Sequence, residues 1–351
     1  MPESKHTTLI ELVKHYSPSG EEAGAVAWLV ARMEALGYER AFRDAAGNAV
    51  GVIGAGPRQV VLLGHIDTVP GEIAVRVEGE RLYGRGAVDA KGPLACFVDA
   101  AARLGAVAGW QWVVIAAVEE ERNSEGARFV RDQYRPDFLI VGEPSGWQRV
   151  TLGYKGSLTA RVEVRRAGAH AAGGQASACD AAIQVWDRVR AFARQFNHDR
   201  ERVFDQVSPS LLGMESGGDG FEDWARLTIG TRLPVGLSPQ EWLDALQGMC
   251  AREQAVCTPL GFPIPAYRAA KNTPLVRAFL KAIRKQGGKP GFVVKTGTAD
   301  LNILAPAWGC PALVYGPGDA ALDHTPDEHI SLPEYERAVI VLAEALRLLT
   351  R

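Results

Sequence analysis

Short apolar runs and amphipathic segments alternate along the first 150 residues. The runs 60–64, 112–117 and 138–141 contain no polar residue, which is typical of strands buried on both faces. Between and before them, the segments 21–36 and 91–104 carry apolar residues at helical spacing. Strands that alternate with helices predict an α/β domain with a mostly parallel central sheet.

The pattern changes near residue 154. Residues 158–164 alternate apolar and polar, which predicts a half-exposed strand. A helix, two strands, a second helix that begins after Ser238 and a last strand follow, over 176–196, 209–215, 224–233, 239–252 and 258–267. This β-α-β-β-α-β order is typical of a ferredoxin-like α+β module. From about residue 270 the α/β pattern resumes. We therefore predict that a smaller domain, 155–268, is inserted between two parts of a larger one, 1–154 and 269–351.

Composition narrows the class of protein. Of 351 residues, 47% are hydrophobic and 23% charged, and the net charge is −2, as in ordinary globular proteins. This balance indicates neither a nucleic-acid partner nor an anionic membrane partner. No apolar stretch is long enough to span a bilayer, and the N-terminal residues do not resemble a signal peptide. Five scattered cysteines without a Cys-x-x-Cys pair indicate reduced thiols, and hence a cytoplasmic protein.

One His and one Asp follow directly after the first apolar run. His65 and Asp67 are two residues apart at the end of a predicted strand, so their side chains can share one face. A His-x-Asp triplet is common by chance and is weak evidence alone. Beyond the carboxyl end of a strand in an α/β sheet, however, it lies where binding sites form.

Four further acidic or His-containing clusters occur at the spacing of whole elements. Asp89 lies in a glycine-rich turn before a predicted helix, where it could equally serve as an N-cap. The clusters Glu119–Glu121 and Glu143 follow predicted strands, and His324 and His329 bracket an acidic turn. Three adjacent acids beyond a buried strand repel one another unless a cation or protons relieve them.

Imidazole and carboxylate together favour Zn²⁺, Co²⁺ or Mn²⁺ over Ca²⁺ or Mg²⁺. Two His, a bridging Asp and two Glu can hold a pair of such ions about 3.5–4 Å apart. A further carboxylate must then act as general base, taking a proton from water and passing it to a leaving amine. Adjacent glutamates can divide metal binding and proton transfer between them.

With these motifs in this order, the chain resembles the M20 family of dinuclear metallohydrolases, which includes deacylases, dipeptidases and carboxypeptidases. The resemblance covers essentially the whole chain. It implies a catalytic α/β/α domain of the zinc-exopeptidase type, formed by 1–154 and 269–351, and a ferredoxin-like lid or dimerisation domain, 155–268. It also implies two divalent ions, Zn²⁺ or alternatively Co²⁺, and a homodimer.

The resemblance assigns roles to the clustered residues. Asp67 orients a ligand, and Glu120 is the general base, while the implied metal ligands are His65, Asp89, Glu121, Glu143 and His324. Asp89 bridges the two ions. The family has Asp where this chain has Glu119, so a shift by one residue would make Glu119 the base and Glu120 the ligand. His329 is the alternative to His324.

Residues outside the metal cluster are also implied. His170 lies in Gly168-Ala169-His170-Ala171-Ala172, which is similar to a family segment whose His stabilises the oxyanion from the partner subunit. Arg232 resembles an Arg that grips a substrate carboxylate. Thr298 and Asp300 fall in a loop similar to the family's substrate loop, Gly-Gly-Thr-Asp.

Within the family, the chain most resembles the branch that releases lysine, and in some cases ornithine, from an amino-group carrier protein in lysine and arginine biosynthesis. The bond cut there is an amide to the carrier's terminal glutamate. We therefore predict this amidohydrolase activity. Two alternatives remain open at this point. One is an N-acetyl-lysine or N-acetylornithine deacetylase or a dipeptidase of the same family, and the other is a non-catalytic metal-binding protein on this fold.

Overall fold

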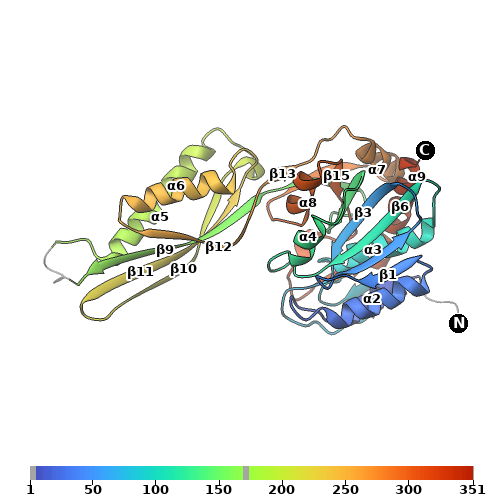
Figure 1. The fold of residues 1–351 in the computed structure, drawn as a ribbon, viewed down its shortest axis with the longest axis horizontal. Coiled ribbons are helices and arrows are strands. Elements are labelled where there is room, and N and C mark those ends of the chain that lie inside the picture. Colours follow the sequence, from blue (N-terminus) through green and yellow to red (C-terminus); the bar gives the residue numbers. More distant parts are fainter. Residues whose placement is uncertain (1–4, 169–173, 351) are drawn as a thin grey trace. The chain divides into compact units, whose positions relative to one another are not determined.

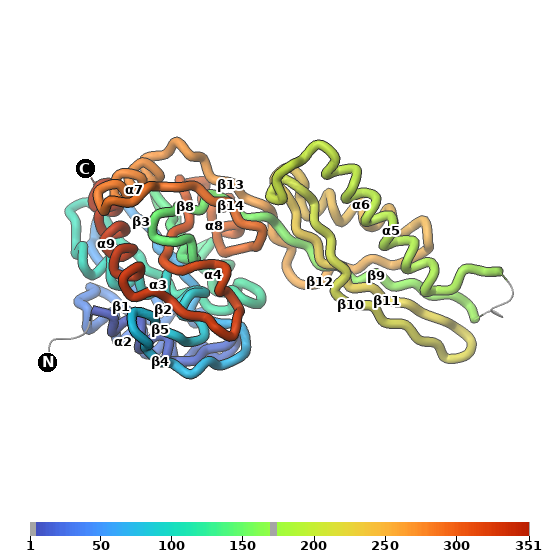
Figure 2. The backbone as a smooth tube through the Cα atoms, turned by 180° about the vertical axis from the view of Figure 1, so that it is seen from behind, coloured from blue at the N-terminus to red at the C-terminus, as the bar shows by residue number. Residues whose placement is uncertain are grey.

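The computed structural model describes residues 5–168 and 174–350, and its backbone forms two compact units. Unit 1 comprises the described residues of 1–153, 269–294 and 299–351, and unit 2 those of 154–268 and 295–298. Figure 1 shows the elements of each unit, and Figure 2 traces the same backbone from behind. In the described part of the chain, no helix has both the length and the apolar character needed to cross a membrane.

Unit 1 is built on a sheet with a parallel centre. Its strands are β1 (Arg40–Arg43), β2 (Ala49–Ile53), β3 (Arg58–His65), β6 (Trp110–Ala117), β7 (Phe138–Gly142), β8 (Arg149–Tyr154), β14 (Gly291–Lys295) and β15 (Ala312–Val314). The order is β1-β2-β6-β3-β7-β15-β8, with β14 beside β8. The β3 strand runs parallel to both β6 and β7, and β15 runs parallel to β7. These central strands are almost wholly buried, which explains their unbroken apolar sequences.

Helices pack on this sheet and on one another. They are α1 (Thr7–Lys14), α2 (Ala23–Ala35), α3 (Lys91–Leu104), α4 (Glu125–Val130), α7 (Pro274–Lys285), α8 (Leu301–Trp308) and α9 (Leu332–Leu349). The α3 helix lies against β3, α9 packs on α3, and α7 packs on α9. A Cβ on Gly64 would lie 3.3 Å from the Cβ of Leu94, so glycine lets α3 approach the end of β3 closely. A small sheet of β4 (Arg76–Glu78), β5 (Arg81–Tyr83) and β16 (His329–Ser331) completes unit 1.

Unit 2 is a ferredoxin-like module. Its elements are β9 (Gly156–Ala167), α5 (Ala178–Asn197), β10 (Ser208–Gly218), β11 (Glu222–Leu233), α6 (Pro239–Ala251), β12 (Val256–Ile264) and the short β13 (Tyr267–Arg268). The antiparallel sheet has the order β10-β11-β9-β12, so the second strand in sequence lies at an edge. Both helices cover one face of this sheet (Figure 1), and buried residues such as Val185 and Trp242 form a core with it.

The predicted fold class is confirmed, with some differences in its elements. Ser238 caps α6 through a reciprocal hydrogen-bond pair with Glu241, as its sequence position indicates. The strand β10 continues to Gly218 and so includes the first three residues of the segment 216–220, which is predicted to be a turn. The α8 helix is not anticipated, because it is short and contains Pro306. The strand β8 is also missed, although five of its six residues are buried.

Candidate functional site

Three candidate clusters lie at the carboxyl ends of parallel strands. His65 is the last residue of β3, Glu119–Glu121 begin two residues after β6, and Glu143 directly follows β7. Figure 1 shows β3 and β6 side by side, and β3 pairs in parallel with both β6 and β7. Parallel strands end at the same edge of a sheet, so the topology brings these side chains together.

The structure gathers six of these side chains into overlapping groups whose ligand atoms lie within 4.8 Å of one another. The groups are His65 with Asp89 and Glu143, His65 with Glu120 and Glu121, and Asp89 with Glu121 and His324. His324 comes from the segment before β16, far away in sequence. Glu119 and His329 belong to none of these groups among the described residues. Among the described residues, the geometry thus brings Glu120, Glu121 and His324 together with the other candidate ligands, and it leaves Glu119 and His329 outside.

Asp89 lies between the two histidines. Its Oδ1 is 3.2 Å from Nε2 of His65, and its Oδ2 is 3.0 Å from Nε2 of His324. The same His324 nitrogen is 2.9 Å from Oε1 of Glu121. Two ligand atoms bound to one tetrahedral zinc ion are about 3.3 Å apart, given bond lengths of roughly 2.0 Å. Each oxygen of Asp89 thus faces a different His at a separation that fits a shared cation, and the donor set fits two ions bridged by Asp89.

The tautomer of His65 follows from its main-chain contact. Its Nδ1 lies 3.0 Å from the backbone oxygen of Asp67, which can only accept a hydrogen bond. The Nδ1 therefore carries the proton, and the lone pair of the neutral ring lies on Nε2, the atom that faces Asp89. This arrangement suits a metal ligand.

Asp67 is fully buried and organises the next cluster as well. Its Oδ1 accepts the backbone N–H of Glu120 at 3.1 Å, and its Oδ2 accepts that of Glu121 at 3.0 Å. The hydroxyl of Ser19 donates to Oδ2 at 2.7 Å. The Asp67 carboxylate thus holds the backbone of both Glu120 and Glu121. Its Oδ1 also lies 3.4 Å from Nδ1 of His65.

Two more residues that sequence analysis does not single out hold this loop. The Oδ1 of buried Asn48 accepts the N–H of Val118 at 3.0 Å, and Oε1 of Glu22 accepts the N–H of Glu119 at 3.2 Å. Glu119 and Ser124 have φ of 58° and 51°, a left-handed conformation that costs non-glycine residues about 1–3 kcal/mol. Surrounding contacts must impose it. Asn48 and Glu22 resemble ordinary turn residues in the sequence, so no signal distinguishes them.

Burial and crowding shift the pKa values of the clustered groups. Burial disfavours the charged form of His65, but hydrogen bonds with Asp67 and Asp89 outweigh it and hold the pKa of the imidazole well above its usual range. Burial, reinforced by Asp300 and Glu143, raises the pKa of Glu120 well above that of an ordinary carboxyl, against the influence of His65. Such a concentration of carboxylates around two imidazoles is stabilised by protons or by cations.

The other predicted site residues have different surroundings. Nη1 of Arg232 donates to Oγ1 of Thr298 at 3.2 Å, both within unit 2. Asp300 lies in unit 1 at the start of α8 and is only 1% exposed, and burial raises its pKa to about 7. His170 lies outside the described residues.

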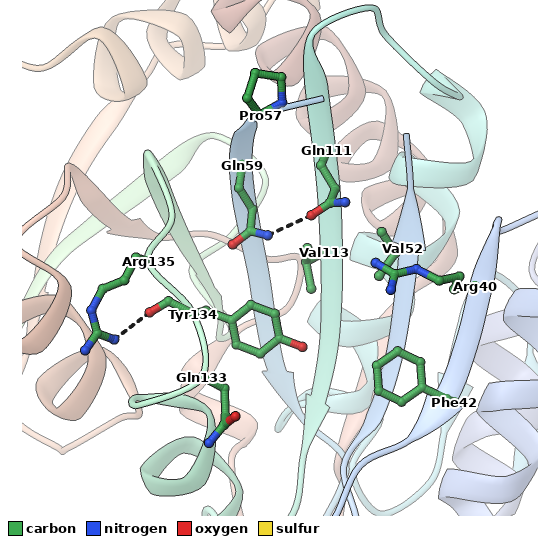
Figure 3. Close-up of a pocket in the computed structure, with 10 residues that line it drawn as sticks. All are labelled: Arg40, Phe42, Val52, Pro57, Gln59, Gln111, Val113, Gln133, Tyr134 and Arg135. Atoms are coloured by element: carbon green, nitrogen blue, oxygen red, sulfur yellow. Dashed lines mark hydrogen bonds between the residues drawn. The ribbon is translucent and has the colours of Figure 1, made fainter. Parts of the chain in front are cut away.

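A separate cavity of about 470 Å³ opens on unit 1 at the opposite end of β3 (Figure 3). Gln59 and Gln111 lie side by side in its lining, with Nε2 of Gln59 donating to Oε1 of Gln111 at 2.8 Å. Gln59 is six residues before His65, which corresponds to about 20 Å along a strand. The cavity contains none of the candidate ligands and is distinct from the site.

Comparison with known proteins shows the family of the chain. The model of peptidase family M20/M25/M40 matches residues 61–348. The chain is 48% identical to a [LysW]-lysine hydrolase of Deinococcus radiodurans, over 94% of this chain and 92% of that protein. It is 30% identical to a [LysW]-lysine/[LysW]-ornithine hydrolase of Sulfurisphaera tokodaii, over 96% of this chain and 93% of that protein.

Solved structures share the fold. An M20 family metallo-carboxypeptidase from Sulfolobus solfataricus superposes with a TM-score of 0.79 at 18% identity, over 99% of each chain. A Bacillus subtilis protein described as a dinuclear metal binding peptidase from the M20 family gives a TM-score of 0.74 at 14% identity, over 98% of each chain. The sequence match spans most of the chain and the fold agrees throughout. The protein belongs to peptidase family M20/M25/M40.

Proposed function

We propose that this protein is a metal-dependent amidohydrolase that releases lysine from the LysW carrier protein, and ornithine where that amino acid is attached instead. The observation that carries this proposal is the 48% identity, over 94% of the chain, to a [LysW]-lysine hydrolase. The site supports it with partly buried Glu120, which lies in a cluster of side chains able to hold two cations. The bond to be cut is the amide between the amino acid and the carrier's terminal glutamate.

We divide the candidate ligands between two metal ions according to which side chains lie close together. His65 and Glu143 would hold one ion, Glu121 and His324 the other, and Asp89 would bridge both. When bound, the ions would polarise the amide carbonyl and lower the pKa of water in the site. The mixed nitrogen and oxygen donors favour Zn²⁺, with Co²⁺ as an alternative that accepts the same ligands.

Glu120 is the proposed general base. Its carboxyl is held in place from the backbone, because Asp67 accepts the Glu120 N–H at 3.1 Å. A raised pKa makes this carboxylate a stronger base, suited to taking a proton from water at its side-chain oxygen. The protonated Glu120 would then donate to the departing amine of lysine. The resemblance implies that Asp300 contacts substrate. Because Asp300 is buried and raises the pKa of Glu120, we propose instead that it acts through Glu120.

Substrate recognition is assigned to Arg232 and Thr298, whose side chains meet at 3.2 Å in unit 2. A guanidinium fork suits the carboxylate of the released amino acid. We keep His170 as the proposed donor to the oxyanion. Unit 1 would be the catalytic domain, and unit 2 the lid and dimerisation domain.

A homodimer is proposed on the edge strand of unit 2. The strand β10 lies at the end of its sheet, and Leu211, Leu212 and Met214 on it are 36%, 63% and 48% exposed. An exposed, apolar edge strand pairs readily with another strand. The five cysteines are all free, which supports a reducing compartment, and we propose the cytoplasm.

A substrate panel tests the function. The purified protein, loaded with Zn²⁺ or with Co²⁺, is mixed separately with LysW-lysine, LysW-ornithine, N-acetyl-lysine, N-acetylornithine and a dipeptide. Mass spectrometry should show release of lysine from LysW at a kcat/KM well above that for the acetylated amino acids. Cleavage of only the acetylated compounds or the dipeptide would overturn the carrier assignment while leaving the amidohydrolase assignment intact.

A further inference from the structure

A buried ion pair lies next to the candidate metal ligands but outside the ligand set. Nη1 of Arg85 donates to Oε2 of Glu328 at 2.9 Å, and the two side chains are 8% and 1% exposed. Arg85 is four residues before Asp89, and Glu328 is four residues after His324. Burying a charged pair costs free energy of desolvation. Because this pair lies beside the segments that carry Asp89 and His324, we expect it to have a role other than stabilising the fold.

The Glu328 carboxylate contacts the main chain of the bridging residue. Its Oε1 accepts the N–H of Val88 at 2.9 Å and the N–H of Asp89 at 3.1 Å. Oε1 accepts from two amides and Oε2 from Arg85, so both oxygens of the carboxylate hold protein atoms. Glu328 is therefore suited to fix the Asp89 backbone and not to bind a cation itself.

Arg85 extends the same contact to two other segments. Its Nη1 also donates to the backbone oxygen of Thr325, next to His324, at 3.2 Å. Its Nε donates to the backbone oxygen of Gly71 at 2.9 Å, on the segment that follows His65 and Asp67. The planar guanidinium presents several donors in fixed directions, which lysine could not do. Three chain segments that carry candidate ligands thus meet at one buried pair.

The conformation of His324 shows why such support is needed. Its φ is 61°, a left-handed value that a residue other than glycine adopts only when its surroundings impose it. The Arg85 contact to the adjacent Thr325 oxygen holds this segment from one side, and the chain re-enters regular structure only at β16.

We propose that Arg85 and Glu328 are positioning residues that set the separation between the Asp89 carboxylate and the His324 imidazole, and so determine the affinity of the two-metal centre. The proposal rests on the assignment of Asp89 and His324 as ligands. Neither side chain need touch substrate or metal. Residues that hold ligands from behind commonly change metal affinity by about 10–100-fold when they are replaced.

The test compares Glu328→Gln and Arg85→Lys with a control that removes a different, partly buried carboxylate from the same unit. Asp99→Asn is suitable, because Asp99 lies on α3 and accepts hydrogen bonds from the hydroxyls of Thr8 and Tyr335, at 2.5 and 2.6 Å. Each protein is first freed of metal, and its unfolding temperature is measured. Its affinity for Co²⁺ is then measured by competition with a chromophoric chelator, and the visible spectrum of its Co²⁺ form is recorded.

We expect Glu328→Gln and Arg85→Lys to bind Co²⁺ about 10–100-fold more weakly than the wild type and to alter the Co²⁺ spectrum. Asp99→Asn should lower the unfolding temperature with little change in affinity or spectrum. The proposal is overturned if the two site variants lose stability like the control yet keep wild-type affinity and spectrum. If the wild type failed to bind two ions, the ligand assignment would be refuted instead. If the wild type bound two ions but did not cleave LysW-lysine, the proposed substrate would be wrong and the positioning role would stand.

Discussion

At the scale of single residues, the site depends on carboxylates with different tasks in similar surroundings. Asp89 directs its two oxygens to two histidines, whereas Asp67 directs both of its oxygens to backbone amides and lies beside His65. Residue type alone does not distinguish these tasks. Hydrogen-bond partners do, because a carboxylate engaged by N–H donors has little capacity left for a cation.

The assignment of the general base gives the first prediction. Glu120→Gln should lower kcat by about 10²–10⁴-fold, since the amide cannot accept the proton, while both ions are retained. Metal content by atomic emission and steady-state kinetics on LysW-lysine would check this. Glu119→Gln is the matched control and should keep nearly full activity. The reverse pattern would mean that the register of the three glutamates is shifted by one.

The pKa of His324 leads to the second prediction. Its hydrogen bond with Asp89, aided by Glu121, raises the pKa of the metal-free imidazole to about 9. The ring is then protonated at pH 7, whereas a metal binds only the neutral form. Binding must therefore expel this proton below about pH 9, and metal affinity should rise as the pH increases toward that value.

Titration calorimetry in two buffers of different protonation enthalpy measures how many protons the protein releases when it binds metal. At pH 7 the wild type should release about one proton more than His324→Gln when it binds Zn²⁺. The control His329→Gln should behave like the wild type, because His329 is not in the cluster. Equal release by the wild type and His324→Gln would contradict the assignment.

At the scale of elements, strand ends were the predictable part of the site. The apolar runs that become β3, β6 and β7 are recognisable in the sequence, and each is followed by an acid or a His. Their parallel pairing then places these residues at one edge. The α8 helix and the supports at Asn48 and Glu22 were not predictable, because short helices and turn residues carry no periodic signal.

The edge strand β10 carries the third prediction. Leu212→Glu places a charge on an exposed apolar edge, and should shift a dimer toward monomer by at least tenfold in dissociation constant. Analytical ultracentrifugation over a range of concentrations measures this shift. Val256→Glu is the control, because Val256 is 65% exposed on β12 at the opposite edge of the same sheet. Dissociation by Val256→Glu alone would assign the interface to the other edge.

At the scale of the whole molecule, two units have separate cores. The core of unit 2 lies between its two helices and one face of its sheet, and includes Val185, Leu246 and Trp242. All the candidate metal ligands lie in unit 1, although they come from both of the larger segments that flank the insertion. A metal that bridges these segments should therefore stabilise unit 1 against unfolding.

Metal removal supplies the fourth prediction. With Zn²⁺ at a thousand times its dissociation constant, binding contributes about 4 kcal/mol. A chelator should then lower the unfolding temperature by roughly 8–16 °C for a unit of this size. Scanning calorimetry with and without chelator checks this. Leu246→Ala, in the core of unit 2, is the control. It should lower the free energy of unfolding of unit 2 by about 2–5 kcal/mol both with and without chelator. An unfolding temperature unaffected by chelator would argue against a metal in unit 1.

The fold class, the inserted module and the residue types of a candidate two-metal site could be predicted from the sequence, because periodicity and chemical type are local properties of the chain. Which members of each cluster lie within reach of one another became visible only in the folded chain. His324 approaches Asp89 and Glu121 across more than 200 residues, and Glu328 reaches the Asp89 backbone across a similar span. Such contacts depend on how distant loops fold onto one strand edge, and no local pattern encodes that.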